Sequence, residues 1–250
     1  MSGHSKWSTI KRKKGANDAA RGKLFARLIK AIEAAAREGG ADPDMNPTLA
    51  TMVQKARDAS VPKDNIARAL DRAAGKDAGG ANWETFTYEG YAPAGVAVYV
   101  VCLTDNKNRA AADVRTAFNK NGGNLAEPGA VGYLFARKGI LRVPAEGVEE
   151  DDLLMAGLDA GIDTVERIDD SWEVTCEPGD LNGLRTALTD AGITVAEVDS
   201  PMLPSMQVPI DNLEDAQKVM RVLDALDDCD DVQEVFANHD FSDEVMEALA

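Results

Sequence analysis

The sequence predicts an α+β protein in which an N-terminal three-helix bundle is followed by two ferredoxin-like α/β domains, one inserted in the other. Three observations lead to this prediction. Apolar residues recur at helical spacing over the first 75 residues, strand and helix signals alternate beyond residue 82, and the charge changes sign between these two parts. Residues 1–76 contain sixteen Lys or Arg and eight Asp or Glu, a net charge of +8. In a chain of net charge −16, residues 77–250 therefore carry −24.

The first predicted helix covers residues 17–37 and is stopped by Gly39 and Gly40. At about 100° per residue, its apolar residues gather on one side, among them Leu28 and Ile32. Three basic residues fall on the opposite side: Lys23, Arg27 and Lys30. We call these three residues the cationic stripe, and the sequence predicts that the helix presents them away from its buried face.

Two further helices are predicted before the linker at residues 77–81. Asn46 is a good N-cap with Pro47 at the first helical position, and Pro62 starts the third helix, which Gly75 ends. Three amphipathic helices with short connections form a small bundle, which we assign to a domain spanning residues 1–78.

Residues 139–200 follow the order βαββαβ of the ferredoxin-like fold. The predicted strands are 140–143, 164–168, 172–176 and 194–198, with helices at 151–161 and 180–192. The flanking segments supply strands at 86–91, 96–103, 133–136, 206–210 and 232–236, with helices at 109–121 and 213–226. We therefore predict a discontinuous α/β domain, 82–136 plus 205–250, and an inserted domain, 137–204.

The charge distribution indicates that a polyanion docks on the N-terminal end, because cations bind phosphates while an acidic remainder repels them. The candidate nucleic-acid-binding residues lie in the first 30 positions: His4, Lys6, Trp7, Lys11, Arg12, Lys13, Lys14, Lys23, Arg27 and Lys30. Trp7 could stack on a base or pack on the bundle, and a basic run can also be a solvated face. Phosphate contacts do not distinguish DNA from RNA. A high-salt habitat would explain the acidity but not the basic N-terminus.

No catalytic constellation is predicted. The two histidines, His4 and His239, have no Cys or carboxylate nearby at metal-ligand or triad spacing. Gly122-Gly123 is typical of a helix end, and the acidic run 149–152 of a helix N-terminus. Asp227-Asp228 is interpreted as a solvated turn. We therefore expect no catalytic residue, no metal, no cofactor and no enzymatic activity.

Location is predicted from cysteine usage and hydropathy. Three widely spaced cysteines are typical of free thiols in a reducing cytoplasm. The longest apolar run, residues 95–103, is too short to cross a bilayer, and no apolar region of a secretory signal follows the basic N-terminus. A mitochondrial transit peptide is the alternative interpretation of those basic residues. We expect a cytoplasmic protein with no membrane partner, and the oligomeric state is left open.

Several long ordered motifs resemble the YebC/PmpR family. They are Ser2-Gly3-His4-Ser5-Lys6-Trp7, Arg21-Gly22-Lys23-Leu24-Phe25, Ser60-Val61-Pro62-Lys63-Asp64-Asn65-Ile66, Tyr88-Glu89-Gly90-Tyr91, Leu103-Thr104-Asp105-Asn106-Lys107-Asn108-Arg109 and Gly122-Gly123-Asn124-Leu125. The resemblance covers nearly the whole chain and is weakest over residues 145–200. It implies a helical N-terminal domain followed by two α/β domains.

The resemblance implies two different functions. Bacterial members are described as probable transcriptional regulators that bind DNA, whereas a mitochondrial relative activates translation of cytochrome c oxidase. Members are also described as ribosome-associated factors that relieve stalling at proline-rich stretches. The predicted helices lack a clear set of base-reading residues. We therefore favour a translation factor that contacts ribosomal RNA, tRNA or the ribosome, with a DNA-binding transcriptional regulator as the alternative. An enzyme or a purely protein-binding scaffold is the third possibility.

Overall fold

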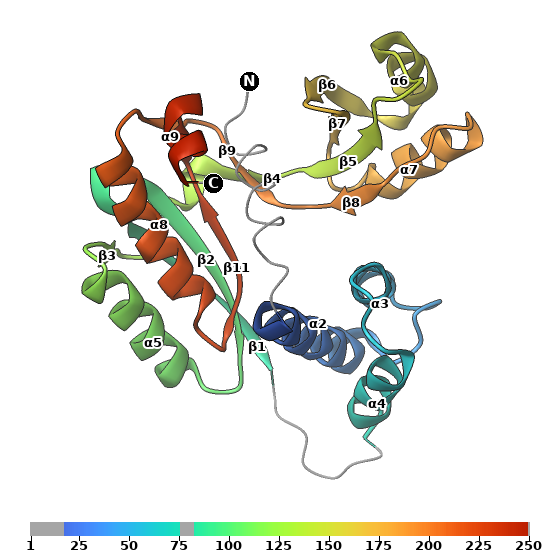
Figure 1. The fold of residues 1–250 in the computed structure, drawn as a ribbon. Coiled ribbons are helices and arrows are strands. Elements are labelled where there is room, and N and C mark those ends of the chain that lie inside the picture. Colours follow the sequence, from blue (N-terminus) through green and yellow to red (C-terminus); the bar gives the residue numbers. More distant parts are fainter. Residues whose placement is uncertain (1–17, 76–82, 250) are drawn as a thin grey trace.

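The computed structural model describes residues 18–75 and 83–249. Figure 1 shows three parts, with helices α2–α4 below the β5–β8 sheet and to one side of the β1–β2–β11 sheet. The predicted α+β class, with N-terminal helices followed by sheet domains, is confirmed.

The helical domain consists of α2 (Asp18–Gly39), α3 (Pro47–Asp58) and α4 (Lys63–Ala73). Asn46 caps α3 as predicted, because its side chain accepts a hydrogen bond from the Leu49 N–H at 3.1 Å. The Asn46 amide also donates to the carbonyls of Ala35 and Gly40, which fixes the turn between α2 and α3. The apolar sides of the three helices enclose one core: Ile32, Ala35, Ala36, Leu49, Val53, Ala56, Val61, Ile66 and Ala69.

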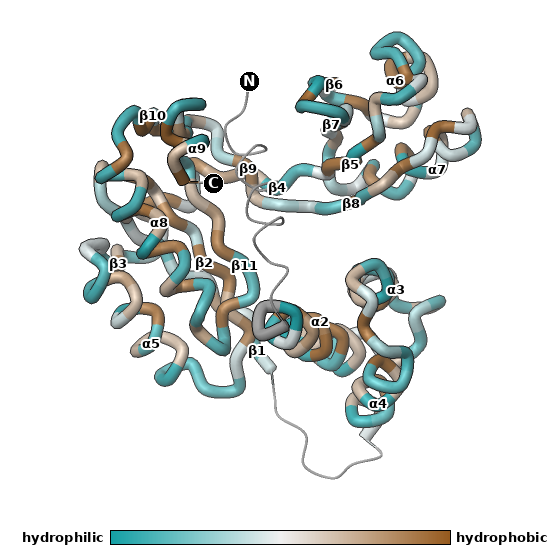
Figure 2. Tube along the Cα trace, viewed as in Figure 1, coloured by the Kyte–Doolittle hydropathy of each residue, from teal (hydrophilic) through white to brown (hydrophobic). Residues whose placement is uncertain are grey.

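The central domain is built on a four-stranded antiparallel sheet of order β11-β2-β1-β3. Its elements are β1 (Glu84–Tyr91), β2 (Ala97–Thr104), α5 (Lys107–Lys120), β3 (Asn124–Leu125), α8 (Leu213–Asp227) and β11 (Val232–Ala237). Helices α5 and α8 cover one face of this sheet (Figure 1). Figure 2 shows the hydrophobic residues concentrated along β2 and β11, beneath these helices. Strand order and directions agree with a ferredoxin-like sheet.

The connectivity of the central domain differs from the simple ferredoxin-like order. In the sheet, β1 lies between β2 and β3. In the chain, β1 comes first, whereas the corresponding strand of a ferredoxin-like fold comes between the two helices. Expected strands 133–136 and 206–210 lie outside the sheet. The first is the 3₁₀ turn η2 (Gly132–Leu134) followed by β4 (Phe135–Arg137), which pairs with β9 (Met202–Pro204). The second is β10 (Val208–Ile210), which pairs in parallel with β12 (His239–Phe241).

The inserted domain has the predicted βαββαβ order and the sheet order β6-β7-β5-β8, with all neighbours antiparallel. Its elements are β5 (Gly139–Pro144), α6 (Glu150–Gly157), β6 (Ile162–Ile168), β7 (Ser171–Cys176), α7 (Leu181–Asp190) and β8 (Glu197–Asp199). The predicted helix 151–161 ends earlier, at Gly157, and continues as the 3₁₀ turn η3 (Leu158–Ala160). The β4–β9 pair joins this domain to the central one. Two short elements complete the chain, η1 (Pro93–Gly95) and α9 (Asp243–Leu249).

One motif, Tyr88-Glu89-Gly90-Tyr91, lies at the C-terminal end of β1 and fixes the packing of this strand against its neighbours. A Cβ at Gly90 would lie 2.7 Å from the Phe118 ring and 2.6 Å from the Asn124 carbonyl oxygen, so that only glycine lets α5 and β3 approach β1. Glu89 is buried, and its carboxylate accepts hydrogen bonds from the N–H groups of Gly129, Val131 and Gly132. Burial alone would raise the pKa of Glu89, but these donors hold it below its ordinary value.

Candidate nucleic-acid interface

The cationic stripe of α2 faces the turn between α8 and β11. This turn carries four aspartates in five residues, Asp227, Asp228, Asp230 and Asp231, and we call residues 227–231 the acidic turn. The two segments are about 200 positions apart in sequence. Their contacts join the helical domain to the central domain.

Lys23 and Arg27 each bind one aspartate of the acidic turn through its carbonyl oxygen and its carboxylate. Lys23 Nζ donates to the Asp228 carbonyl oxygen at 2.8 Å and lies 2.9 Å from its carboxylate. The Arg27 guanidinium donates to the Asp227 carboxylate at 3.1 Å and also to the Asp227 carbonyl oxygen. Partly exposed pairs of this kind contribute about 0.2–1 kcal/mol each.

Lys30 binds the C-terminal end of the acidic turn, where the central domain holds Asp231 in place. Its Nζ donates to the Asp230 carbonyl oxygen at 2.9 Å and lies 3.4 Å from the Asp231 carboxylate. It also lies 5.1 Å from the centroid of the Trp83 ring, within range of a cation–π contact. Lys30 therefore contacts both the turn and the residue that precedes β1.

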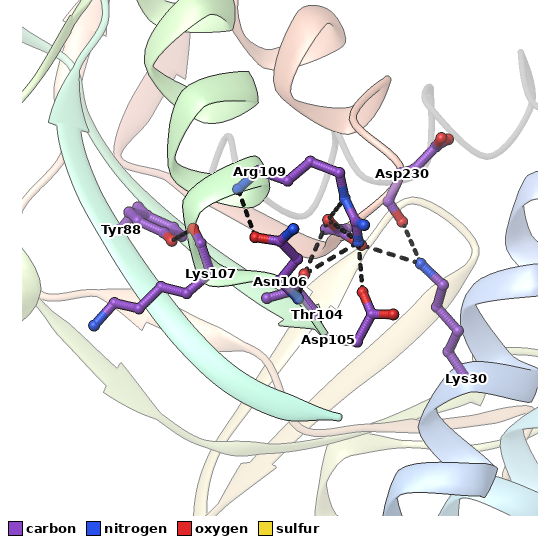
Figure 3. A network of polar contacts seen from close by, with 9 residues as sticks. Lys30, Tyr88, Thr104, Asp105, Asn106, Lys107, Arg109 and Asp230 are labelled. Carbon is purple, nitrogen blue, oxygen red and sulfur yellow. Dashed lines mark hydrogen bonds and ion pairs between the residues drawn. The ribbon is translucent and has the colours of Figure 1, made fainter. Parts of the chain in front are cut away.

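Asp231 is the anchor of the acidic turn. Figure 3 shows the labelled residues Thr104, Asp105, Arg109, Asp230 and Lys30 of this polar network lying close together. The Asp231 carboxylate accepts hydrogen bonds from Thr104 Oγ1 at 3.0 Å and from Arg109 Nε and Nη2 at 2.9 and 3.1 Å. Only 4% of its side chain is exposed. Arg109 also donates to Asp105, which holds the pKa of that carboxyl below its ordinary value. The motif from Leu103 to Arg109 therefore positions the turn.

These contacts correct two expectations. The cationic stripe does not stand free on the far side of α2, because only 15–32% of each side chain is exposed. Asp227-Asp228 is not a purely solvated turn, because both residues receive a cation from α2. The apolar periodicity gave the correct faces of the helix but held no information about a partner 200 residues away. The charge complementarity of the two segments was the signal available.

The other predicted binding residues, His4, Lys6, Trp7, Lys11, Arg12, Lys13 and Lys14, lie outside the described residues. In the sequence, residues 1–17 hold five Lys or Arg and no acidic residue. We call residues 1–17 the basic arm. Their role in nucleic-acid binding stays a prediction.

The outer side of α4 carries charges of both signs. Lys63 and Arg68 are exposed there, but so are Asp64 and Asp71. The Arg68 guanidinium donates back to the Asp64 carbonyl oxygen and to Asn65 Oδ1. This surface would attract a phosphate backbone weakly, because acidic side chains interrupt the basic ones.

A second ion pair connects the helical domain with the inserted domain. Lys55 Nζ on α3 lies 2.6 Å from the carboxylate of Asp199 at the end of β8. Nearby, Arg137 at the end of β4 lies 3.9 Å from Glu234 on β11. The surrounding protein desolvates Glu234 and raises its pKa, against the opposing effect of Lys55 and Arg137. Charged groups from all three domains therefore meet at this point.

The described residues offer little for covalent or metal chemistry. Burial raises the pKa of Cys102 to about 12 and the pKa values of Cys176 and Cys229 to about 11, so these thiols are protonated at neutral pH. Within residues 18–75 and 83–249, no cluster of His, Cys, Asp and Glu could hold a metal ion. No helix in that part of the chain is long and apolar enough to cross a membrane.

The fold and the charged interface define a three-domain α+β protein whose N-terminal helices dock on an acidic body. Residues 5–76 match the TACO1/YebC protein N-terminal domain, and residues 83–239 match the TACO1/YebC second and third domain. The chain therefore belongs to the TACO1/YebC family.

Relatives agree along the whole chain. A probable transcriptional regulatory protein of Thermobifida fusca is 57% identical over 250 residues, with all of both chains covered. A protein of the same description from Acidothermus cellulolyticus is 58% identical and covers 98% of this chain and 99% of its own. The crystal structure of a conserved hypothetical protein from Aquifex aeolicus superposes with a TM-score of 0.80 at 41% identity. That match covers 92% of this chain and 94% of the Aquifex chain.

Proposed function

We propose that the protein is a non-enzymatic, nucleic-acid-binding regulator of gene expression that acts in translation in the cytoplasm. In this proposal it binds ribosomal RNA or tRNA on the ribosome and relieves stalling at proline-rich sequences. The basic arm supplies the first phosphate contacts, and the acidic central and inserted domains set the direction of approach.

The observation that carries the proposal is that both sides of α2 are occupied. Its apolar side packs on α3 and α4, and its cationic side lies on the acidic turn. While α2 is docked in this way it cannot enter a major groove, which DNA recognition by a helix requires, and the three cations of its stripe suit phosphate contacts better than base readout. The mixed charges of α4 offer no replacement, so the available cations are those of the basic arm, which favour backbone contacts to RNA over base readout by a helix.

The absence of catalysis is part of the same proposal. We expect the protein to promote a slow step of translation by positioning RNA or peptidyl-tRNA, without supplying a reactive group. The raised thiol pKa values support this expectation, because they leave the described cysteines weakly nucleophilic.

Sedimentation with ribosomes tests the proposal. The protein in a cell lysate should migrate with ribosomal subunits and should leave them after nuclease treatment or at high salt. In a reconstituted translation system it should speed synthesis through a proline run and leave an ordinary message nearly unchanged. Equal effects on both messages, or none on either, would count against it.

The alternative is a DNA-binding transcriptional regulator. It is favoured by the description of the relatives as probable transcriptional regulatory proteins. Exclusive recovery of the protein with chromosomal DNA in the same lysate would select this alternative.

A further inference from the structure

We propose that the acidic turn is an internal competitor of nucleic acid, which covers the cationic stripe until RNA phosphates displace it. This inference rests on the proposed function and adds a regulatory step to it. The stripe would contact phosphates once the helical domain leaves the turn.

The turn offers each cation of the stripe a carbonyl oxygen and a carboxylate oxygen at hydrogen-bond distance. The phosphates of a nucleic-acid backbone present closely spaced anionic oxygens that the same three cations can bind. The turn and a phosphate backbone are therefore alternative ligands of one surface, and they cannot occupy it together.

The interface between the stripe and the turn can separate without exposing a hydrophobic core. The buried apolar cluster of α2–α4 contains only residues from that domain, and the largest cluster of the central domain contains none from it. Among the described residues, the contacts between stripe and turn are polar. Ion pairs of this kind weaken with ionic strength and exchange readily for other ions.

The aspartates of the acidic turn are held to different extents. Asp231 is held by Thr104 and Arg109 and belongs to the central domain whether or not α2 is docked. Asp228 and Asp230 are exposed, and each contacts a basic side chain of the stripe, Lys23 and Lys30 respectively. Asp227, Asp228 and Asp230 can therefore be neutralised while the anchor stays in place.

The experiment measures binding of a short single-stranded RNA of mixed sequence to the full-length protein over a salt series. The uncovered variant carries Asp227→Asn, Asp228→Asn and Asp230→Asn. A charge-matched control carries Glu146→Gln, Asp159→Asn and Asp190→Asn, three exposed residues of the inserted domain. A third protein combines the uncovered variant with Lys23→Gln, Arg27→Gln and Lys30→Gln. Circular dichroism is used to check that each variant is folded.

The uncovered variant should bind RNA several-fold more tightly than the wild type. The slope of log affinity against log salt should steepen by about 1.4, because Lys23 and Arg27 each gain a phosphate contact that contributes about 0.7 for single strands, while Lys30 keeps Asp231 as a partner. The gain should disappear in the combined protein and should be small in the charge-matched control.

Three results would overturn the inference. An equal gain in the control would show general repulsion by the acidic surface instead of competition at the stripe. Wild-type binding without a gain in the uncovered variant would reject the competition and leave the proposed function standing. No binding by any variant would reject both.

Discussion

The two sides of α2 are held in different ways, and the difference shows which part of this fold is permanent and which can change. On one side, Ile32 is fully buried with Ala35 and Ala36 in a core shared with α3 and α4. On the other side, the cationic stripe binds the acidic turn through partly exposed ion pairs. Apolar burial is not weakened by salt and fixes the helical domain, whereas ion pairs are screened by salt and can be exchanged. The same helix can therefore keep its fold while changing its polar partner.

The largest expected effect is on the apolar side. Ile32→Ala should lower the free energy of unfolding by about 2–5 kcal/mol, because it leaves a cavity where three helices meet. Urea unfolding followed by circular dichroism measures this, with the exposed Glu38→Ala as the matched control on the same helix. A loss no larger than that of the control would mean that Ile32 is not in the core.

A smaller loss in the free energy of unfolding is expected at Glu89, a buried carboxylate that accepts hydrogen bonds from three backbone N–H groups. Glu89→Gln should cost about 1–3 kcal/mol, because an amide cannot accept from all three backbone donors that the carboxylate satisfies. The pKa of Glu89 in the folded protein lies below its ordinary value. The carboxylate therefore stabilises the fold at pH values above the pKa that Glu89 has in the unfolded chain. This stabilisation is lost as the pH falls through the pKa of Glu89 in the folded protein.

The pH dependence gives the readout. Unfolding of wild type and Glu89→Gln should be compared at neutral and acidic pH. The difference between the two proteins should shrink as the pH falls. A difference that stays constant with pH would contradict the account of this carboxylate.

The smallest effect on stability is expected on the polar side of α2. Lys23→Gln with Arg27→Gln should cost about 0.2–1 kcal/mol per pair, and less at high salt. Distance measurements between labels on α4 and α5 should nevertheless show the helical domain further from the central domain. An unchanged distance would mean that other contacts, such as Lys55 with Asp199, are enough to hold it.

The sequence predicted those parts of the molecule that depend on local pattern. The start of α3 at Asn46 follows from its cap, and the inserted domain follows from alternating strand and helix signals. The position of β1 next to β3, the pairing of β4 with β9, and the docking of Lys23 on Asp228 depend on residues far apart in the chain. Local pattern does not encode which distant partner a strand edge or a cation meets.

The central claim is that the basic arm binds nucleic acid through phosphate contacts, and salt dependence of RNA binding tests it most directly. Replacing Lys11, Arg12, Lys13 and Lys14 with Ala in the full-length protein should weaken binding across RNA sequences and leave the unfolding curve unchanged. The slope of log affinity against log salt should fall by roughly 2–4 units, at about 0.7 per phosphate for single strands and 0.9 for duplex DNA. An unchanged slope in a folded variant would contradict the claim and would show that these four cations face solvent without binding phosphate.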